Sequence, residues 1–194
     1  TYYWPPDFHQ VLEWQWNEVA IPYWIEQAKF AADHGVKIAI EPHPGFLVYS
    51  PETMIRLREA AGETVGANFD PSHFFWQGID PVKAVLRLGK AIHHVHAKDT
   101  ALHPVHAEVN GHLDTKVSSR VTERSWSFRT VGYGHDEKFW CDFVSALRMI
   151  GYDGALSMEH EDPLMTPMEG LRKGVEFLQR VVLRESKDVP SPGR

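Results

Sequence analysis

The sequence has little cysteine, no long hydrophobic run and no excess of positive charge. Its single cysteine, Cys141, excludes a framework of internal disulfides and fits a reducing compartment. No stretch approaches the roughly 20 apolar residues of a membrane-spanning helix, and no cationic, then apolar segment opens the chain. The net charge of −6 has the wrong sign for a protein that holds a nucleic acid. We therefore expect a cytoplasmic protein with no membrane and no nucleic-acid partner.

What is present is the composition of an ordinary globular protein, with 43% hydrophobic and 24% charged residues in 194. This length predicts a single domain over residues 1–194, with an irregular start at 1–13 and a frayed tail at 186–194. Residues 99–125 are polar and irregular. A loop of that length is usually functional or mobile, so we expect a lid or an oligomer contact there.

Short apolar runs alternate with helical patterns along the chain. Serine or aspartate followed by proline begins two of the helices, at Ser50-Pro51 and Asp80-Pro81, and Thr166-Pro167-Met168-Glu169 reads as a capping box. The alternation predicts a parallel α/β sheet, either doubly wound or an eight-stranded barrel. No Gly-x-Gly-x-x-Gly follows a strand, which disfavours a dinucleotide-binding sheet. The predicted strands are 36–41, 65–70, 91–97, 125–131 and 154–159.

Four potential metal ligands lie at the ends of four of these strands. They are Glu41, Asp70, His96 and Glu159. Functional groups gather at the carboxyl ends of the strands in a parallel barrel, so the four side chains should meet. Three carboxylates crowded together need a cation or protons to neutralise them. With one imidazole they form a mostly oxygen shell, which suits one Mn²⁺, Mg²⁺ or Co²⁺ ion and also admits Zn²⁺.

Each of these residues also has an ordinary explanation when taken alone. Glu41 fits a solvated rim, Asp70-Pro71 a turn, His96 a packed histidine and Glu159 a polar loop. None of these separate explanations accounts for four potential ligands that each lie at the end of a predicted strand. The joint pattern therefore favours a metal site.

The same residues carry a resemblance to a known family. The strings "KIAIEPHPGF", "NFDPSHFFWQGIDP", "HHVHAKDT" and "GALSMEHED" resemble the xylose isomerase-like TIM-barrel superfamily, close to its sugar phosphate isomerases and epimerases, from about Trp14 to Leu183. The resemblance implies a (βα)8 barrel of which this chain holds the C-terminal five βα units, strands four to eight. Strands one to three have no counterpart. We therefore expect a part of a longer barrel or a sheet that another chain completes.

The resemblance also implies site residues and a reaction. Glu41, Asp70, His96 and Glu159 would end strands four, five, six and eight and match the single-metal set, and Gly132-Tyr133-Gly134 matches the turn after strand seven. Glu41 and Glu159 would act as base and acid in an isomerisation or epimerisation of a sugar or polyol, with or without a phosphate group, through an enediolate. His73 would contact substrate or a second metal.

Three further residues are candidates for substrate contact, each with a structural alternative. Lys98 could hold a hydroxyl group or only pair with Asp99, and His43 could touch substrate or only shape its loop. Trp76 could form an apolar wall against a sugar, although core packing is the commoner use of such a ring.

Other functions stay open. An endonuclease IV-like metal-dependent phosphodiesterase would use the same ligands, but the negative net charge and the absence of an Asp-x-His pair in "VGYGHDE" disfavour it. A lyase or hydrolase with the same metal, a non-catalytic sugar-binding relative and a homo-oligomer are further alternatives.

Overall fold

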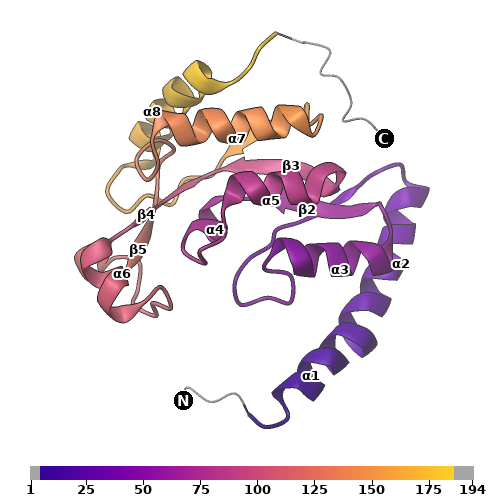
Figure 1. The fold of residues 1–194 in the computed structure, drawn as a ribbon. Helices are drawn as coiled ribbons and strands as arrows, with labels where there is room; N and C mark the ends of the chain where they lie inside the picture. Colours follow the sequence, from indigo (N-terminus) through magenta and orange to yellow (C-terminus); the bar gives the residue numbers. More distant parts are fainter. Residues whose placement is uncertain (1–4, 186–194) are drawn as a thin grey trace.

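The computed structural model describes residues 5–185 and is built on a four-stranded parallel sheet. The order is β1 (Ile38–Ile40), β2 (Val65–Phe69), β3 (Ile92–Ala97) and β6 (Leu156–Met158). All three pairings are parallel, so the strands end at the same edge. Figure 1 shows β2 and β3 in the middle of the molecule, with helices beside them. The prediction of a parallel α/β sheet is confirmed.

The two faces of the sheet differ in chemistry. Val65, Ala67, Phe69 and Val95 point to one face and are fully buried in the apolar core. The alternate residues point to the other face, where Asn68 and His96 contact each other and remain half-buried. Since strand side chains alternate, Glu41, Asp70 and Glu159 follow their strands on this second, polar face.

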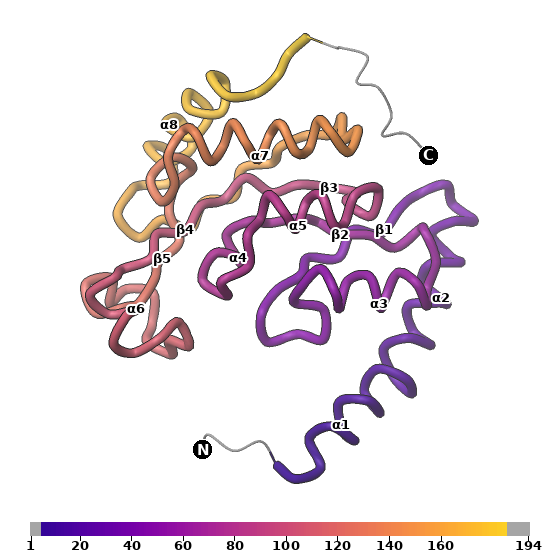
Figure 2. The backbone as a smooth tube through the Cα atoms, viewed as in Figure 1, coloured from indigo at the N-terminus to yellow at the C-terminus, as the bar shows by residue number. Residues whose placement is uncertain are grey.

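The apolar face is covered by helices that contact one another in sequence order: α2 (Ile21–Asp33), α3 (Pro51–Ala61), α5 (Pro81–Leu88), α7 (Glu137–Met149) and α8 (Pro167–Val181). Figure 2 shows this succession from indigo to yellow along the tube. The predicted N-caps form, because Ser50, Asp80 and Thr166 each accept a backbone N–H of the first turn. The capping box predicted at Thr166 is only half formed in the described residues, because the side chain of Glu169 makes no return bond to the backbone N–H of Thr166. Two short helices, α4 (Ser72–Phe75) and the 3-10 turn η2 (Gly89–Ala91), complete this part.

The start of the chain is more regular than the sequence predicts. Helix α1 (Phe8–Trp14) runs into a π-helical segment η1 (Gln15–Ala20) and then into α2. The prediction of an irregular segment over 1–13 is therefore wrong from Phe8 onward. The wider π turn shifts the apolar stripe around the helix, so a 3.6-residue period does not extend across it. Residues 1–4 and the predicted tail at 186–194 lie outside the described residues.

The prediction of five parallel strands is also wrong in one element. Strand β5 (Trp126–Arg129) pairs antiparallel with β4 (Asp99–Leu102), outside the main sheet, and β6 takes the place beside β3. The segment between β4 and β5 contains α6 (Pro104–Asn110) and the 3-10 turn η3 (Val121–Glu123), where the sequence predicted an irregular loop. A β-ribbon with these two helical elements satisfies backbone groups that an irregular loop would leave to water. The role of this segment as a lid or oligomer contact stays a prediction.

No helix in residues 5–185 is both long enough and apolar enough to cross a bilayer.

Candidate metal centre

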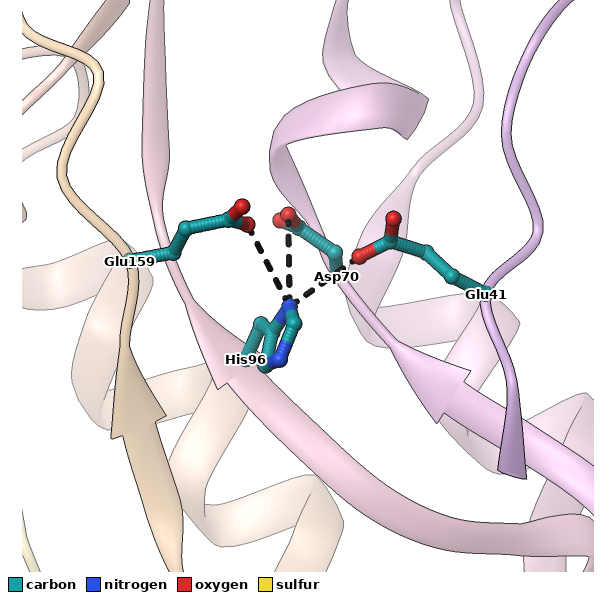
Figure 3. Close-up of side chains that lie close together, drawn as sticks. All are labelled: Glu41, Asp70, His96 and Glu159. Atoms are coloured by element: carbon teal, nitrogen blue, oxygen red, sulfur yellow. Dashed lines mark hydrogen bonds and ion pairs between the residues drawn. The ribbon is translucent and has the colours of Figure 1, made fainter. Parts of the chain in front are cut away.

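The structure brings the four predicted ligands together at the carboxyl edge of the sheet. Each of Glu41, Asp70, His96 and Glu159 offers one ligand atom, and these atoms all lie within 4.8 Å of one another. The imidazole of His96 is central: its Nδ1 lies 3.0 Å from Glu41 Oε1, 3.3 Å from Glu159 Oε2 and 4.0 Å from Asp70 Oδ2. Figure 3 shows the three carboxylates pointing toward this nitrogen from three different strands.

Asp70 is the most deeply placed ligand. Its carboxylate is fully buried, and Oδ1 accepts the backbone N–H of Ser72 at the start of α4. Burial raises the pKa of Asp70 to about 6, although the positive charge of Lys98 opposes this shift. The other oxygen, Oδ2, accepts no hydrogen bond from the described residues. A buried carboxylate oxygen of this kind is costly unless a cation lies near it, and Nζ of Lys98 is 3.2 Å away.

The ammonium group of Lys98 pairs with the carboxylates of the cluster rather than with that of Asp99. It is only 2% exposed, and its Nζ is 2.8 Å from Glu159 Oε2 and 3.2 Å from Asp70 Oδ2. Burial alone would lower the pKa of Lys98, but the neighbouring carboxylates raise it above its ordinary value. Burial likewise acts to raise the pKa of Glu159, and the hydrogen bond and charge of Lys98 bring it below its usual range. Both groups are therefore charged at neutral pH.

Two of the predicted substrate-contact histidines lie against the cluster. His73 is 2% exposed, and its Nε2 is 3.5 Å from Asp70 Oδ2 and 3.8 Å from Glu41 Oε2. Burial, followed by the charges of Lys98, His43 and His96, lowers the pKa of His73 to about 2, so the ring is neutral. Neither ring nitrogen makes a hydrogen bond with the described residues. The ring of His43 lies beside that of His73, with centroids 4.1 Å apart.

Trp76 lies in a different packing environment. Its ring is half-buried and stacks on that of Trp126, with centroids 4.6 Å apart and planes 5° from parallel. The contact with substrate that the sequence suggested for Trp76 stays a prediction. Phe74, the other aromatic residue of this segment, is fully buried in the core against Phe69.

Three residues near the cluster escaped the sequence analysis. Glu161 places Oε2 3.5 Å from the Nζ of Lys98, and Phe128 of β5 places its ring 4.5 Å from the same atom. Asn68 lies 3.2 Å from Nε2 of His96. Asn68 could have been predicted from the sequence, because it lies two residues before Asp70 and therefore on the same face of the strand. Nothing local in the sequence shows that β5 folds back over Lys98.

The cluster has a closed side and an open side. Asp70, His73 and Lys98 are almost fully buried, whereas the side chains of Glu41 and Glu159 are 29% and 36% exposed. A pocket of about 450 Å³ opens beside Glu41, and aromatic and aliphatic side chains form most of its lining together with His43. Pockets of this size hold small molecules. The two glutamates are therefore the members of the cluster most open to a ligand from solvent.

The sequence of the chain matches a family of known proteins. The model of a family described as xylose isomerase-like TIM barrel matches residues 2–181. The chain is 46% identical over 183 residues to the uncharacterised protein YfiH of Bacillus subtilis, covering 94% of this chain and 58% of that protein. It is 35% identical to the rhizopine catabolism protein MocC of Rhizobium meliloti, covering 79% and 46%. It is 29% identical to an inosose dehydratase of Clostridium botulinum, covering 78% and 50%. The chain thus spans about half the length of these relatives.

Solved structures share the fold at lower identity. The IolI protein, solved with a bound zinc atom, superposes with a TM-score of 0.61 at 23% identity, covering 85% of this chain and 55% of that one. The probable 3-DHS dehydratase AsbF of Bacillus anthracis superposes with a TM-score of 0.60 at 16% identity, covering 82% and 55%. These matches show a TIM-barrel-like α/β fold.

Proposed function

The chain belongs to the xylose isomerase-like TIM barrel family, and from that premise we propose that it carries the metal-binding half of an enzyme that acts on a sugar or polyol. In this proposal β1, β2, β3 and β6 correspond to strands four, five, six and eight of the barrel. The observation that carries the proposal is the convergence of Glu41, Asp70, His96 and Glu159 on one point of the polar sheet face.

The residues fit a divalent ion. Bonds of about 2.0–2.2 Å allow ligand atoms to be at most about 4.4 Å apart, so a spread of 4.8 Å needs only a small inward shift of side chains. Asp70 Oδ2 is buried and accepts no hydrogen bond from the described residues, although Nζ of Lys98 lies 3.2 Å away, so this oxygen can also coordinate an ion at the centre of the cluster. Three carboxylates and one imidazole favour Mn²⁺, Mg²⁺ or Co²⁺ and also accept Zn²⁺. The bound ion would polarise the substrate carbonyl group and stabilise the negative charge that develops on its oxygen.

The two glutamates are placed for proton transfer. Oε2 of Glu159 faces Lys98 and His96, and Oε1 of Glu41 faces His96. The second oxygen of Glu41, Oε2, lies 3.8 Å from Nε2 of His73. In this proposal the substrate approaches the two carboxylates from their partly exposed side. Glu159 is held ionised, so we assign it as the base that removes the proton from the carbon next to the carbonyl group. Glu41, on the other side, takes up a proton from solvent and delivers it to the enediolate, so that the sugar is isomerised or epimerised. Glu159 then releases the proton it removed to solvent, and both carboxylates return to their starting state.

His73 and His43 complete the binding side. The nitrogens of His73 make no hydrogen bonds with described residues, and its Nε2 lies between Asp70 and Glu41. A neutral imidazole can accept or donate one bond, so Nε2 is available to a substrate hydroxyl group. His43 packs against this ring and fixes its orientation.

Dehydration is a second candidate, favoured by the relatives that are named inosose dehydratase. It begins with the same removal of a proton next to a carbonyl group, and it differs in that a neighbouring hydroxyl group then leaves as water. A panel of ketoses and inososes incubated in D₂O separates the two. Isomerisation or epimerisation introduces solvent deuterium into a product of the same composition, whereas dehydration gives a product that has lost one water.

Metal content tests the shared premise of both candidates. We expect the purified protein to bind one divalent ion per chain and to lose thermal stability in a chelator, because three carboxylates are then left without their cation. A protein that binds no divalent ion, and that melts at the same temperature with and without chelator, would refute the proposed metal enzyme.

A further inference from the structure

Lys98 occupies a position that resembles a second cation site. Its Nζ lies within 3.5 Å of one oxygen from each of three carboxylates, Asp70, Glu159 and Glu161. Two of these oxygens, Asp70 Oδ2 and Glu159 Oε2, are also the ones nearest to His96 Nδ1. The same pair of oxygens therefore faces two neighbouring positions, one at His96 and one filled by the ammonium group.

Carboxylates that face two cation positions at once are the usual bridges of two-metal sites, where the ions lie about 3.5–4 Å apart. We propose that the ammonium group of Lys98 is a resident cation in the second position of a bridged two-cation centre, and that it restricts the cluster to a single divalent ion. This inference rests on the proposed function and concerns the occupancy of that same site. Lys98 is in this view a positioning residue and not a contact for substrate.

Charge supports the assignment. The four carboxylates of Glu41, Asp70, Glu159 and Glu161 carry four negative charges, and Lys98 reduces this to three. One divalent ion then leaves a single negative charge, whereas a second divalent ion beside the ammonium group would give the centre a net positive charge. A positive centre with buried members is costly, so the presence of Lys98 disfavours a second ion.

Packing keeps the ammonium group in place. The ring of Phe128 lies 4.5 Å from Nζ, and the same ring meets His73 edge-on with centroids 5.5 Å apart. The β4–β5 ribbon thereby covers Lys98 and keeps water from replacing its carboxylate partners. A cation held over an aromatic face and between carboxylates also neutralises Asp70 and Glu159 when no metal is bound.

The test is the number of Mn²⁺ ions bound by the metal-free protein and its variants at pH 7.5, measured by calorimetry and by electron paramagnetic resonance. The wild type and Lys98→Arg should bind one ion. Lys98→Ala vacates the second position and should bind two, and because the ions share bridging carboxylates their spectra should show exchange coupling. Lys138→Ala removes the same charge from an exposed pair with Asp142 and should bind one ion with unchanged affinity.

Lys98→Gln covers the case in which the alanine variant does not fold. It keeps the length of the side chain without its charge, so loss of the repulsion between ammonium and metal should tighten binding of the first ion by on the order of tenfold. One ion with unchanged affinity in Lys98→Ala, or weaker binding in Lys98→Gln, would overturn the inference while the proposed function stands. A wild type that binds no Mn²⁺ would refute the proposed function itself, and the inference with it.

Discussion

The Nδ1 atom of His135 lies 2.8 Å from Oδ1 of Asp99, a fully buried carboxylate that directly follows Lys98. The other oxygen of Asp99 accepts the backbone N–H groups of Gly132, Gly134 and His135 at 3.0, 3.1 and 2.9 Å. One carboxylate thereby ties the turn after β5 to the start of β4. Because this turn follows Phe128 in β5, and the ring of Phe128 contacts Lys98, Asp99 helps to hold the ribbon beside the cluster of candidate ligands.

Asp99→Asn should destabilise the protein by about 2–4 kcal/mol, because an amide nitrogen replaces one acceptor oxygen among several buried N–H donors. Urea denaturation measures this difference. Asp142→Asn removes a carboxylate from an exposed pair and serves as the control, with an expected change within about 0.5 kcal/mol. Equal effects of the two substitutions would show that Asp99 does not anchor the turn.

Gly134→Ala should destabilise by about 1–3 kcal/mol through overpacking of the same turn. A Cβ atom at this position would lie 2.4 Å from the backbone oxygen of Thr100 and 2.6 Å from Oδ1 of Asp99. Neither neighbour can move without breaking the anchor. Gly154→Ala is the comparison variant, since its Cβ would meet the hydroxyl end of the Tyr152 side chain, which can shift at the cost of its single hydrogen bond to the backbone oxygen of Ala155. A larger loss for Gly154→Ala than for Gly134→Ala in thermal unfolding would contradict this reading.

Asp114 should make the stability of the β4–β5 segment dependent on pH. Its carboxylate is 1% exposed and accepts the N–H groups of Ser125 and Lys116 at 2.7 and 2.9 Å. Burial acts to raise the pKa of Asp114, but these bonds and the Lys116 ammonium hold it well below its usual range. A depressed folded pKa stabilises the fold above the unfolded pKa, near 4, and this contribution is lost as the pH falls further.

Asp114→Asn should therefore cost about 1–3 kcal/mol at pH 6, and the difference from wild type should shrink progressively below about pH 4. Urea denaturation of both proteins at several pH values measures this. A difference that stays constant from pH 6 to pH 2.5 would mean that the ionised carboxylate is not the stabilising group.

The sequence was sufficient to predict the strands and helices that follow from local patterns of apolar and polar residues. The apolar runs that became β1, β2, β3 and β6 end at Glu41, Asp70, His96 and Glu159, and a parallel sheet necessarily brings such ends to one edge. The helix caps were equally local. The pairing of β5 with β4 could not be predicted in this way, because an alternating pattern indicates a strand but does not specify which strand it pairs with. The position of Lys98 among three carboxylates likewise depends on contacts between residues far apart in the sequence. The 3.6-residue apolar period gave no sign of the π-helical segment.

Asp70→Asn and Glu159→Gln should separate metal binding from proton transfer. Both should lower metal-dependent turnover by about 10²–10⁴-fold. Asp70 supplies a buried ligand with no hydrogen bond to its Oδ2 from described residues, so its amide variant should also lose the thermal stabilisation given by Mn²⁺. Glu159 is 36% exposed at its side chain and keeps one oxygen as an amide, so its variant should retain part of that stabilisation while solvent-deuterium exchange into substrate stops.

Glu63→Gln changes a 95% exposed carboxylate and should alter neither turnover nor the thermal stabilisation by Mn²⁺. Full turnover in either of the first two variants, with Mn²⁺ present, would overturn the assignment of that residue.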